Sequence, residues 1–191
     1  MRTVFFLFSG CFWRVLAAVF LLALAPAAGG AEKPLDRVLK PGDAAPDFTL
    51  PSAEGLPVRL GDFRGKWLVL DFCPSDETPG CTLEAHNFQS DLAEYQKAGA
   101  VVLGVSPDSP QRHKEFAARQ ELTFPLLTDR KRKAGKRYGA WRRLALVLKR
   151  PSRATFLVDP RGRIAKIWLD ADPRHHRGDV LAALAELEKK P

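Results

Sequence analysis

One cysteine in the sequence stands where a thiol becomes reactive. The segment Pro74-Ser-Asp-Glu-Thr78-Pro-Gly-Cys81 follows an apolar, strand-like run and precedes a run with helical spacing, so Cys81 is predicted at a helix N-terminus. Unpaired backbone N–H groups in the first helical turn, together with the positive end of the helix dipole, stabilise a thiolate and lower its pKa below the free value of about 8.5. The sequence therefore indicates sulfur chemistry at Cys81.

The runs on either side of this segment predict the elements that hold Cys81 in place. Residues 67–72 are almost continuously apolar, which is typical of a strand buried on both faces. From Cys81 onward, apolar side chains recur at steps of four and three until Gly99, which predicts a helix of about eighteen residues. Residues 100–105 predict the next strand. A helix between two buried strands indicates parallel neighbours in a right-handed crossover.

The rest of the pattern completes an α/β arrangement. Near the N-terminus, a short strand is predicted over 47–51, its hairpin return over 58–60, and a loop or single helical turn over 61–66. After the crossover, helices are predicted over 111–120, 131–138 and 179–189, and a strand over 124–127. A hairpin is predicted over 154–158 and 164–168. This order predicts an α/β fold of thioredoxin-like type, with a mixed central sheet flanked by helices.

Residues 1–27 have the composition of a secretory signal peptide. An apolar run over 15–24 follows Arg14 and precedes small residues that suit a signal peptidase. The run is shorter than the roughly 20 residues that cross a bilayer, so a cleaved signal is expected rather than a retained N-terminal anchor. Cleavage is placed after Ala27, with alternative sites after Ala28 or Ala31. We therefore expect a periplasmic or otherwise exported protein.

The remaining sequence predicts one globular domain. A chain of 191 residues has room for one domain with a full hydrophobic core. We expect a flexible lead-in over 28–38 and the domain itself over 39–190. Apolar residues make up 46% and charged residues 27% of the chain, which excludes a disordered chain and a multispanning membrane protein.

The mature chain would be basic and poor in cysteine. The whole sequence carries a formal charge of +8, and loss of two arginines with the signal leaves 28 basic and 22 acidic residues, or +6. Cleavage also removes Cys11, so Cys73 and Cys81 remain and disulfide stapling is not expected to stabilise the fold. Residues 130–150 contain ten basic residues and no acid. We interpret them as a solvated face, with weak contact to an anionic membrane surface or an acidic reductase as alternatives.

Several segments resemble one protein family. The pattern Pro74-x-x-x-Thr78-x-x-Cys81 is similar to the peroxidatic-cysteine motif of the peroxiredoxins. Segments that resemble the bacterioferritin-comigratory, or peroxiredoxin Q, branch are Lys40 to Leu50, Ala98 to Asp108, Phe124 to Leu127 and Arg153 to Phe156. The resemblance covers roughly residues 38 to 189. It implies a thiol peroxidase for hydrogen peroxide and organic hydroperoxides, with a sulfenic acid intermediate that an external thiol or thioredoxin-like partner reduces. It also implies a monomer or weak dimer without a cofactor.

The resemblance also implies roles for individual residues. Cys81 would be the nucleophile that attacks the peroxide, and the Thr78 hydroxyl and the Cys81 N–H would hold the peroxide oxygens. Pro74 would shield the pocket from water. Arg153 would lower the pKa of the thiol and donate to the transition state, and Glu84 would orient that arginine. Structural alternatives are a helix cap for Thr78, a surface position for Arg153 and a helix-dipole partner for Glu84.

The sequence departs from the branch at the resolving cysteine. Many members carry it five residues after the peroxidatic cysteine, where this chain has His86, which we interpret as a packed or solvated side chain. Cys73 lies where relatives commonly have an aromatic residue, and a disulfide with Cys81 needs the two Cα atoms within about 7 Å. We hypothesise a one-cysteine cycle in which Cys73 only packs, with Cys73 as the resolving cysteine as the alternative.

Two other functions and two kinds of ligand are alternatives to this interpretation. A thiol-disulfide oxidoreductase would need two cysteines in the pattern Cys-x-x-Cys. A Sco-type copper chaperone would need Cys-x-x-x-Cys and a distal histidine. Seven residues separate Cys73 from Cys81, which matches neither pattern. His175 and His176 are expected in a loop after Pro173, without a second ligand pair at metal spacing. We therefore predict no metal site, and nucleic acid is not an expected partner of an exported chain.

Overall fold

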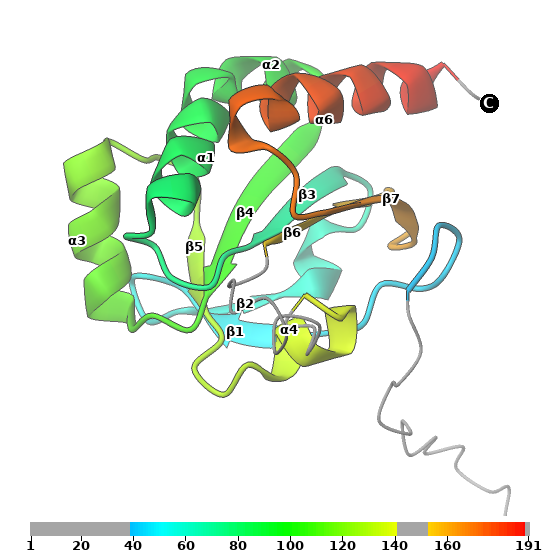
Figure 1. The fold of residues 1–191 in the computed structure, drawn as a ribbon. Coiled ribbons are helices and arrows are strands. Elements are labelled where there is room, and N and C mark those ends of the chain that lie inside the picture. Colours follow the sequence, from blue (N-terminus) through cyan, green and yellow to red (C-terminus); the bar gives the residue numbers. More distant parts are fainter. Residues whose placement is uncertain (1–38, 141–152, 190–191) are drawn as a thin grey trace, which may run out of the picture. The chain divides into compact units, whose positions relative to one another are not determined.

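The computed structural model describes residues 39–140 and 153–189 (Figure 1). The elements in chain order are β1 (Thr49–Pro51), β2 (Pro57–Arg59), the 3-10 helix η1 (Leu60–Phe63), β3 (Trp67–Phe72), α1 (Pro79–Ser90), α2 (Leu92–Lys97), β4 (Ala100–Ser106), α3 (Pro110–Gln120), β5 (Leu126–Thr128), α4 (Lys133–Tyr138), β6 (Ala154–Val158), β7 (Ile164–Leu169) and α6 (Pro173–Glu188). The predicted signal over 1–27 and lead-in over 28–38 lie outside the described residues.

A mixed five-stranded sheet forms the centre of the domain, as predicted. Its strand order is β5-β4-β3-β6-β7. Strand β4 runs parallel to β3 and β5, whereas β6 runs antiparallel to β3 and β7. The predicted parallel pairing of β3 with β4 and the predicted hairpin of β6 with β7 are both confirmed. Strands β1 and β2 form the predicted N-terminal hairpin as a separate antiparallel pair.

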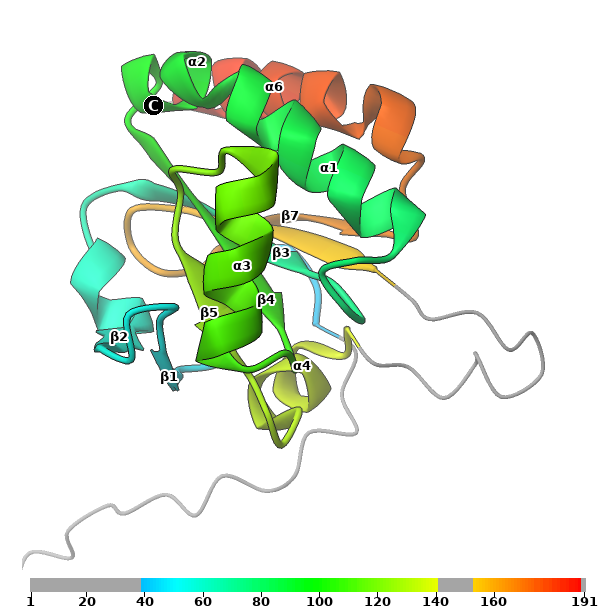
Figure 2. The same cartoon turned by 90° about the vertical axis from the view of Figure 1, so that its left-hand side faces the viewer.

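Helices α1, α2 and α6 cover one face of the sheet, and η1, α4 and the β1–β2 hairpin lie on the other (Figures 1 and 2). Successive side chains of β3 alternate between these layers. Leu68, Leu70 and Phe72 belong to the core that includes Tyr138 of α4. Val69 belongs to the core on the α1 side. The odd-numbered side chains of β3 therefore point toward α1.

The predicted helix from Cys81 to Gly99 is two helices. Helix α1 begins two residues earlier than expected, at Pro79, and ends at Ser90. The break is at Asp91, whose backbone leaves the helical range with φ −102° and ψ 12°. The Asp91 carboxylate forms an ion pair with Arg177 of α6 at 3.2 Å, so the break between α1 and α2 contacts the third helix on this face of the sheet.

Helix α6 begins six residues before the position predicted from its apolar spacing. Asp172 caps the helix by accepting a hydrogen bond from the Arg174 N–H at 3.0 Å, and Pro173 follows at the first helical position. Proline suits that position because its missing N–H would have no helical partner. The prediction that His175 and His176 lie in a loop is therefore wrong: both are in the first turn of α6.

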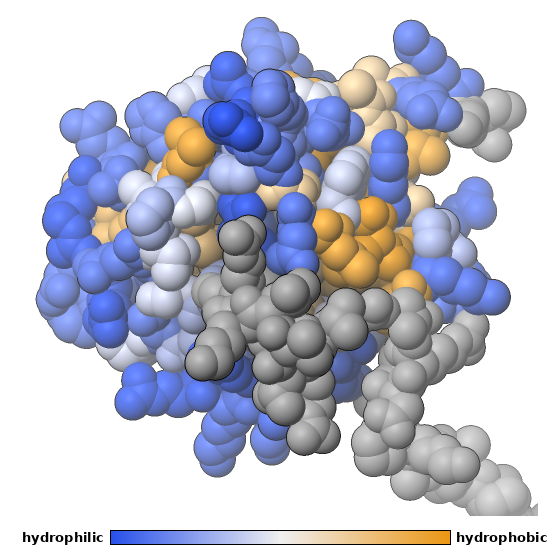
Figure 3. Space-filling model, in the orientation of Figure 1, coloured by the Kyte–Doolittle hydropathy of each residue, from blue (hydrophilic) through white to orange (hydrophobic). Residues whose placement is uncertain are grey.

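Hydrophilic side chains cover much of the face shown in Figure 3. Within residues 39–140 and 153–189, no helix has the length and apolar character that spanning a bilayer requires. In the described part of the basic segment 130–150, most basic side chains are exposed, and Arg137 is half-buried with a hydrogen bond to the Asp47 carbonyl at 2.7 Å. This agrees with a solvated face. Residues 141–150 lie outside the described part of the chain.

Candidate active site

Cys81 lies in the first turn of α1, as predicted. Pro79 begins the helix, and Thr78 caps it by accepting a hydrogen bond from the Cys81 N–H at 3.4 Å. The Thr78 hydroxyl in turn donates to the Ser75 carbonyl at 3.2 Å. The structure thus gives Thr78 a capping role and places its hydroxyl at the same helix end as the sulfur. The positive end of the α1 dipole favours negative charge at this position.

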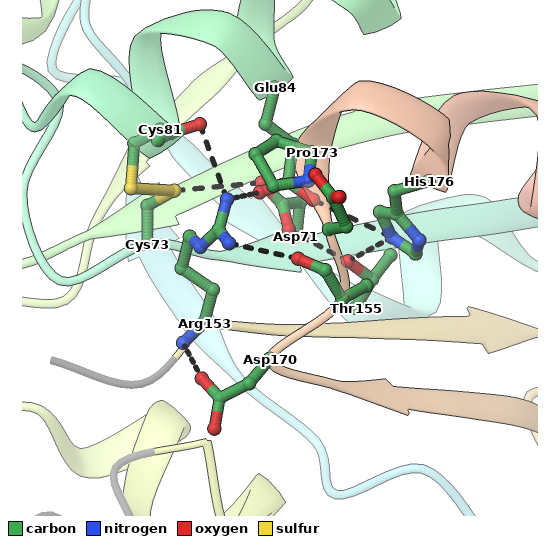
Figure 4. Close-up of polar contacts among 12 residues, drawn as sticks. Asp71, Cys73, Cys81, Glu84, Arg153, Thr155, Asp170, Pro173 and His176 are labelled. Carbon is green, nitrogen blue, oxygen red and sulfur yellow. Dashed lines mark hydrogen bonds and ion pairs between the residues drawn. A yellow bond between two sulfur atoms is a disulfide. The ribbon is translucent and has the colours of Figure 1, made fainter. Parts of the chain in front are cut away.

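Cys81 is bonded to Cys73 in a disulfide (Figure 4). The two Cα atoms are 6.0 Å apart, inside the range of about 4.4–6.8 Å that a disulfide spans without backbone movement. Both residues are buried. The interpretation of Cys73 as a residue that only packs is therefore wrong, and the hypothesis of a one-cysteine cycle loses its premise that Cys81 has no partner thiol.

The alternation of side chains along β3 explains why Cys73 faces Cys81. Leu70 and Phe72 point to the α4 side, so Asp71 points to the α1 side, and Cys73 continues that alternation. The Cys73 N–H donates to the Val105 carbonyl of β4 at 2.9 Å, which extends the parallel ladder one residue beyond β3. The end of β3 therefore presents a sulfur directly to the beginning of α1.

The Arg153 side chain reaches from the beginning of β6 to the first turn of α1 (Figure 4). Its Nη1 donates to the Gly80 carbonyl at 3.3 Å and forms an ion pair with Glu84 Oε2 at 3.1 Å. Its Nη2 donates to the Ala171 carbonyl at 2.8 Å, and its backbone N–H donates to Asp170 at 3.0 Å. Both ends of Arg153 are thus fixed, and its charge lies at the helix end that carries the predicted nucleophile.

Asp71 is a second acid at this site, and sequence analysis did not single it out. It lies opposite Thr155 in the β3–β6 ladder and accepts a hydrogen bond from the Thr155 hydroxyl at 2.9 Å. Its Oδ2 is 3.7 Å from the sulfur of Cys73. One carboxylate oxygen of Asp71, one of Glu84 and the Cys73 sulfur all lie within 4.8 Å of one another.

Burial raises the pKa values of both acids. The pKa of Asp71 rises to about 6 against the opposing effects of the Thr155 hydroxyl and the Arg153 charge. The pKa of Glu84 rises to about 9, with the Asp71 charge adding to burial and Arg153 opposing it. Two carboxyl groups this close titrate as a pair. Near neutral pH the pair therefore holds about one proton and one negative charge beside Arg153.

His176 of α6 completes this polar cluster. Its Nε2 is 2.8 Å from the Thr155 hydroxyl oxygen and 3.5 Å from Glu84 Oε1. The ring is buried between Trp168 and Phe88, with centroid distances of 5.4 and 6.0 Å. Burial lowers the pKa of His176 to about 4, so the ring is neutral at physiological pH.

Comparisons with known proteins identify this arrangement. The AhpC/TSA family model matches residues 41–167. Peroxiredoxin Bcp of Bacillus subtilis is 36% identical over 152 residues, covering 78% of this chain and 97% of that protein. Chloroplastic peroxiredoxin Q of Triticum aestivum is 38% identical over 177 residues, covering 91% and 80%. The chain belongs to the peroxiredoxin family, in its Bcp/PrxQ branch.

Solved structures agree with this family and with the predicted thioredoxin-like fold. The bacterioferritin comigratory protein of Xanthomonas campestris, described for its alkyl peroxide reduction, superposes with a TM-score of 0.72 at 36% identity, covering 81% of this chain and all of that one. A PrxQ mutant of Xylella fastidiosa gives a TM-score of 0.75 at 30% identity, covering 80% and 99%. The protein is a peroxiredoxin and thus a thiol peroxidase, so neither the oxidoreductase nor the copper-chaperone alternative is retained.

In this peroxiredoxin, contacts on the α3 side fix the loop that joins the two cysteines. The Asp76 carboxylate lies 2.6 Å from Nδ1 of the fully buried His113. The Asp76 N–H donates to Asp108 at 2.9 Å, and the Asp76 carbonyl accepts from the Thr82 hydroxyl at 3.2 Å. Pro74, which was expected to shield the pocket, is half-buried at the start of this loop. The loop is therefore held at its centre as well as at both cysteines.

The cluster of Asp71, Cys73 and Glu84 also has the atom types of a metal site. In this form, however, the sulfur of Cys73 is bonded to Cys81, and the Glu84 carboxylate is paired with Arg153. A metal prefers a thiolate and carboxylates that are free to coordinate. The donor set therefore fits proton transfer between neighbouring groups better than it fits a cation.

The residues that were predicted from the sequence thus lie together around the N-terminus of α1: Pro74, Thr78, Cys81, Glu84 and Arg153. The residues that sequence analysis missed are Asp71, Thr155 and His176, together with the Asp76–His113 pair. Asp71 did carry a signal, because it is the one charged residue in the apolar run 67–72. His86, by contrast, is exposed, in agreement with its interpretation as a solvated side chain.

Proposed function

We propose that this peroxiredoxin is an exported thiol peroxidase in which Cys81, as a thiolate, reduces hydrogen peroxide and organic hydroperoxides. The observation that carries the proposal is the position of Cys81 in the first turn of α1, with the Arg153 guanidinium on the carbonyl of the preceding residue, Gly80. The helix end and the guanidinium both favour a thiolate over a thiol.

The reaction at Cys81 needs a nucleophile and donors for the oxygen that leaves. The thiolate attacks one peroxide oxygen, the O–O bond breaks, and the sulfur becomes a sulfenic acid while the other oxygen leaves as an alkoxide or hydroxide and takes up a proton. The Arg153 guanidinium and the Cys81 N–H are the donors that would stabilise the developing charge. Glu84 and the Ala171 carbonyl hold the arginine, so its position costs little reorganisation during the reaction.

A related protein supports the proposed substrate, and the basic residues near α4 bear on the proposed reductant. The bacterioferritin comigratory protein of Xanthomonas campestris has alkyl peroxide reduction activity, which supports organic hydroperoxides as substrates here. A thioredoxin-like protein or a small thiol would return the oxidised cysteine to its reduced form. The exposed basic residues near α4 would favour an acidic reductase or a weak contact with an anionic membrane surface. A monomer or weak dimer remains the expected state.

Rapid mixing of the reduced protein with hydrogen peroxide tests the proposal. We expect Cys81→Ser to abolish the fast phase and Arg153→Ala to slow it by about 100-fold or more, since one preorganised donor to a developing anion contributes about that factor. The control is Arg161→Ala, which removes an exposed arginine from the turn between β6 and β7. A fast phase that survives Cys81→Ser would refute the proposed function.

A further inference from the structure

Helix α1 is intact from its first turn while Cys73 and Cys81 are bonded to each other. Cys81 lies eight positions after Cys73, the two Cα atoms are 6.0 Å apart, and α1 begins at Pro79 with the bond in place. Accepting Cys81 as the peroxidatic cysteine, as proposed above, we propose that Cys73 is the resolving cysteine of this peroxiredoxin and that Asp71 accepts the proton of its thiol. The sulfenic acid at Cys81 is then resolved within the same chain.

The proposed step balances without any further oxidant or reductant. The Cys73 thiol gives its proton to the Asp71 carboxylate, and the resulting thiolate attacks the sulfur of the Cys81 sulfenic acid. The new S–S bond forms as the S–O bond breaks, so Cys73 is oxidised and the sulfenic sulfur is reduced. Hydroxide leaves and takes the proton from Asp71 to form water. An external dithiol later reduces the disulfide by thiol–disulfide exchange.

The geometry of Asp71 suits this proton transfer. Its Oδ2 lies 3.7 Å from the Cys73 sulfur, within the contact range of a sulfur hydrogen bond, and its Oδ1 accepts from the Thr155 hydroxyl. The strand places both side chains on the α1 side of the sheet, two residues apart. Thr155 and the β3–β6 ladder therefore aim one carboxylate oxygen at the thiol that must be deprotonated.

A small cavity adjoins the two sulfurs and Asp71. Its volume of about 20 Å³ is enough for one water molecule, which needs roughly 10–15 Å³ on the same measure. Apart from Asp71, Cys73 and Cys81, its lining includes Asp76 and the rings of Phe116 and Phe124. The hydroxide released from the sulfenic acid would therefore have a place to become water beside the group that holds its proton.

The charged surroundings of Asp71 decide whether it can act as a base. The titratable or charged side chains that face it are Cys73, Glu84 of α1, Tyr95 of α2, Arg153 ahead of β6, His176 of α6 through Thr155, and Asp76 across the cavity. Burial raises the pKa of Asp71 to about 6 and that of Glu84 to about 9. The two acids titrate as one pair that holds about one negative charge near neutral pH, so the pair can accept the Cys73 proton through the Asp71 oxygen that faces the sulfur. A base with a pKa near the working pH is effective in proton transfer.

Mass spectrometry of the full chain after one equivalent of hydrogen peroxide tests the role of Cys73. No lysine or arginine lies between Lys66 and Lys97, so the sample is cleaved after Glu77, which separates the two cysteines unless they are bonded. We expect linked Cys73 and Cys81 peptides in the wild type. In Cys73→Ser and Cys73→Ala, we expect a sulfenic acid at Cys81 that dimedone traps and that excess peroxide overoxidises.

Two results would overturn the role of Cys73. One is a wild type in which Cys73 stays free while sulfenic acid accumulates at Cys81, and the other is a Cys73→Ser variant whose Cys81 sulfenic acid disappears as fast as in the wild type. Rapid mixing separates this failure from failure of the proposed function. If Cys73→Ser keeps the fast reaction with peroxide, Cys81 is peroxidatic whatever the fate of its sulfenic acid.

The variant Asp71→Asn tests the proton acceptor. The two steps are measured separately in this variant, and we expect disulfide formation from the sulfenic acid to be about 100-fold slower than in the wild type, at the lower end of a general-base effect. In the wild type, the rate of disulfide formation should rise with pH around 6, and Asp71→Asn should lack that rise. The control Glu94→Gln removes an exposed carboxylate from α2. Equal rates of disulfide formation in Asp71→Asn and the wild type would overturn the role of Asp71.

Discussion

At the scale of single residues, the site depends on how closely Arg153 approaches the backbone of α1. A Cβ atom at Gly80 would lie 3.1 Å from Arg153 Nη1 and 3.3 Å from Cζ, which is tighter than ordinary van der Waals contact. The guanidinium cannot retreat freely, because Glu84 and the Ala171 carbonyl hold it. An alanine at position 80 would therefore push the guanidinium away from the helix by a few tenths of an ångström.

Gly80→Ala should displace the guanidinium while leaving the fold intact. We expect the fast reaction with peroxide to slow by about 10-fold or more, since a displaced donor loses part of the roughly 100-fold or larger effect of one that is well placed. The free energy of unfolding should change by less than about 1 kcal/mol, because alanine is the better helix former. Rapid-mixing kinetics and urea unfolding measure the two quantities.

Gly178→Ala is the matched control. Gly178 is exposed in α6, and a Cβ there would meet no atom within 4 Å. This variant should gain about 0.5–1 kcal/mol of stability from helix propensity and react with peroxide at the wild-type rate. If Gly80→Ala also reacted at the wild-type rate, the position of Arg153 would not limit the reaction.

The sequence identified the reactive residues better than it identified their neighbours. Cys81 and Thr78 could be placed because a capping residue, a proline and a thiol follow one another within four positions. Arg153 and Glu84 depended on resemblance, since nothing local brings together residues 69 positions apart. The Cys73–Cys81 bond could not be predicted, because its Cα distance depends on the path of the loop that Asp76 and its partners hold.

At the scale of elements, α6 completes the site by placing His176 against β6. The neutral ring bonds to the Thr155 hydroxyl, which also serves Asp71. This contact was not predicted, because the apolar spacing of the helix becomes clear only at Asp179. The signal that could have corrected it was Asp172-Pro173, since an N-cap acid followed by proline is typical of a helix start.

Burial of His176 predicts a loss of stability in acid. The unfolded histidine titrates near 6.5, whereas the folded one has its pKa lowered to about 4. The stability that neutral His176 contributes is thus fully present above pH 6.5 and is lost as the pH falls toward 4, by up to roughly 3 kcal/mol at about 1.4 kcal/mol per pKa unit. Urea unfolding from pH 7 to 4 should show this loss relative to His176→Gln.

Comparing the wild type with His176→Gln separates the effect of His176 on stability from the effects of Asp71 and Glu84. Asp71 and Glu84 have raised pKa values, so the stability linked to their protonation is present at low pH and is lost as the pH rises. Their effect is opposite in sign and should be largely common to the wild type and His176→Gln. His175→Gln, which changes the exposed neighbour, should follow the wild-type curve. Parallel curves for the wild type and His176→Gln would contradict the buried neutral ring.

At the scale of the whole molecule, the sequence predicted the fold well. The parallel β3–β4 pair and the β6–β7 hairpin were recognisable because long apolar runs and a turn at 159–162 leave few alternative pairings. The continuous helix predicted from Cys81 to Gly99 was wrong: the backbone leaves the helical range at Asp91, whose carboxylate contacts Arg177 of α6, far away in the sequence. Local patterns thus predicted the elements, and local capping residues mark the starts of α1 and α6, whereas the end of α1 coincides with a contact that is distant in sequence.

Export of the whole protein is a separate prediction that rests on residues 1–27. Expression of the full chain in a bacterium, followed by cell fractionation and intact-mass measurement, should give a periplasmic protein that begins at residue 28. The control replaces Leu21 and Leu22 with Arg, which interrupts the apolar run that the secretion machinery binds. A full-length protein in the cytoplasm of cells carrying the unaltered sequence would refute export.

The most direct test of the proposed chemistry is the pKa of the Cys81 thiol in the reduced protein. The rate of alkylation at Cys81, followed across pH by the mass of its peptide after cleavage at Glu77, reports the thiolate. We predict a pKa at least one unit below the free value of about 8.5, and a higher one in Arg153→Ala. A Cys81 pKa of about 8.5 or above in the wild type would contradict the central claim that the helix end and the guanidinium hold a thiolate ready for peroxide.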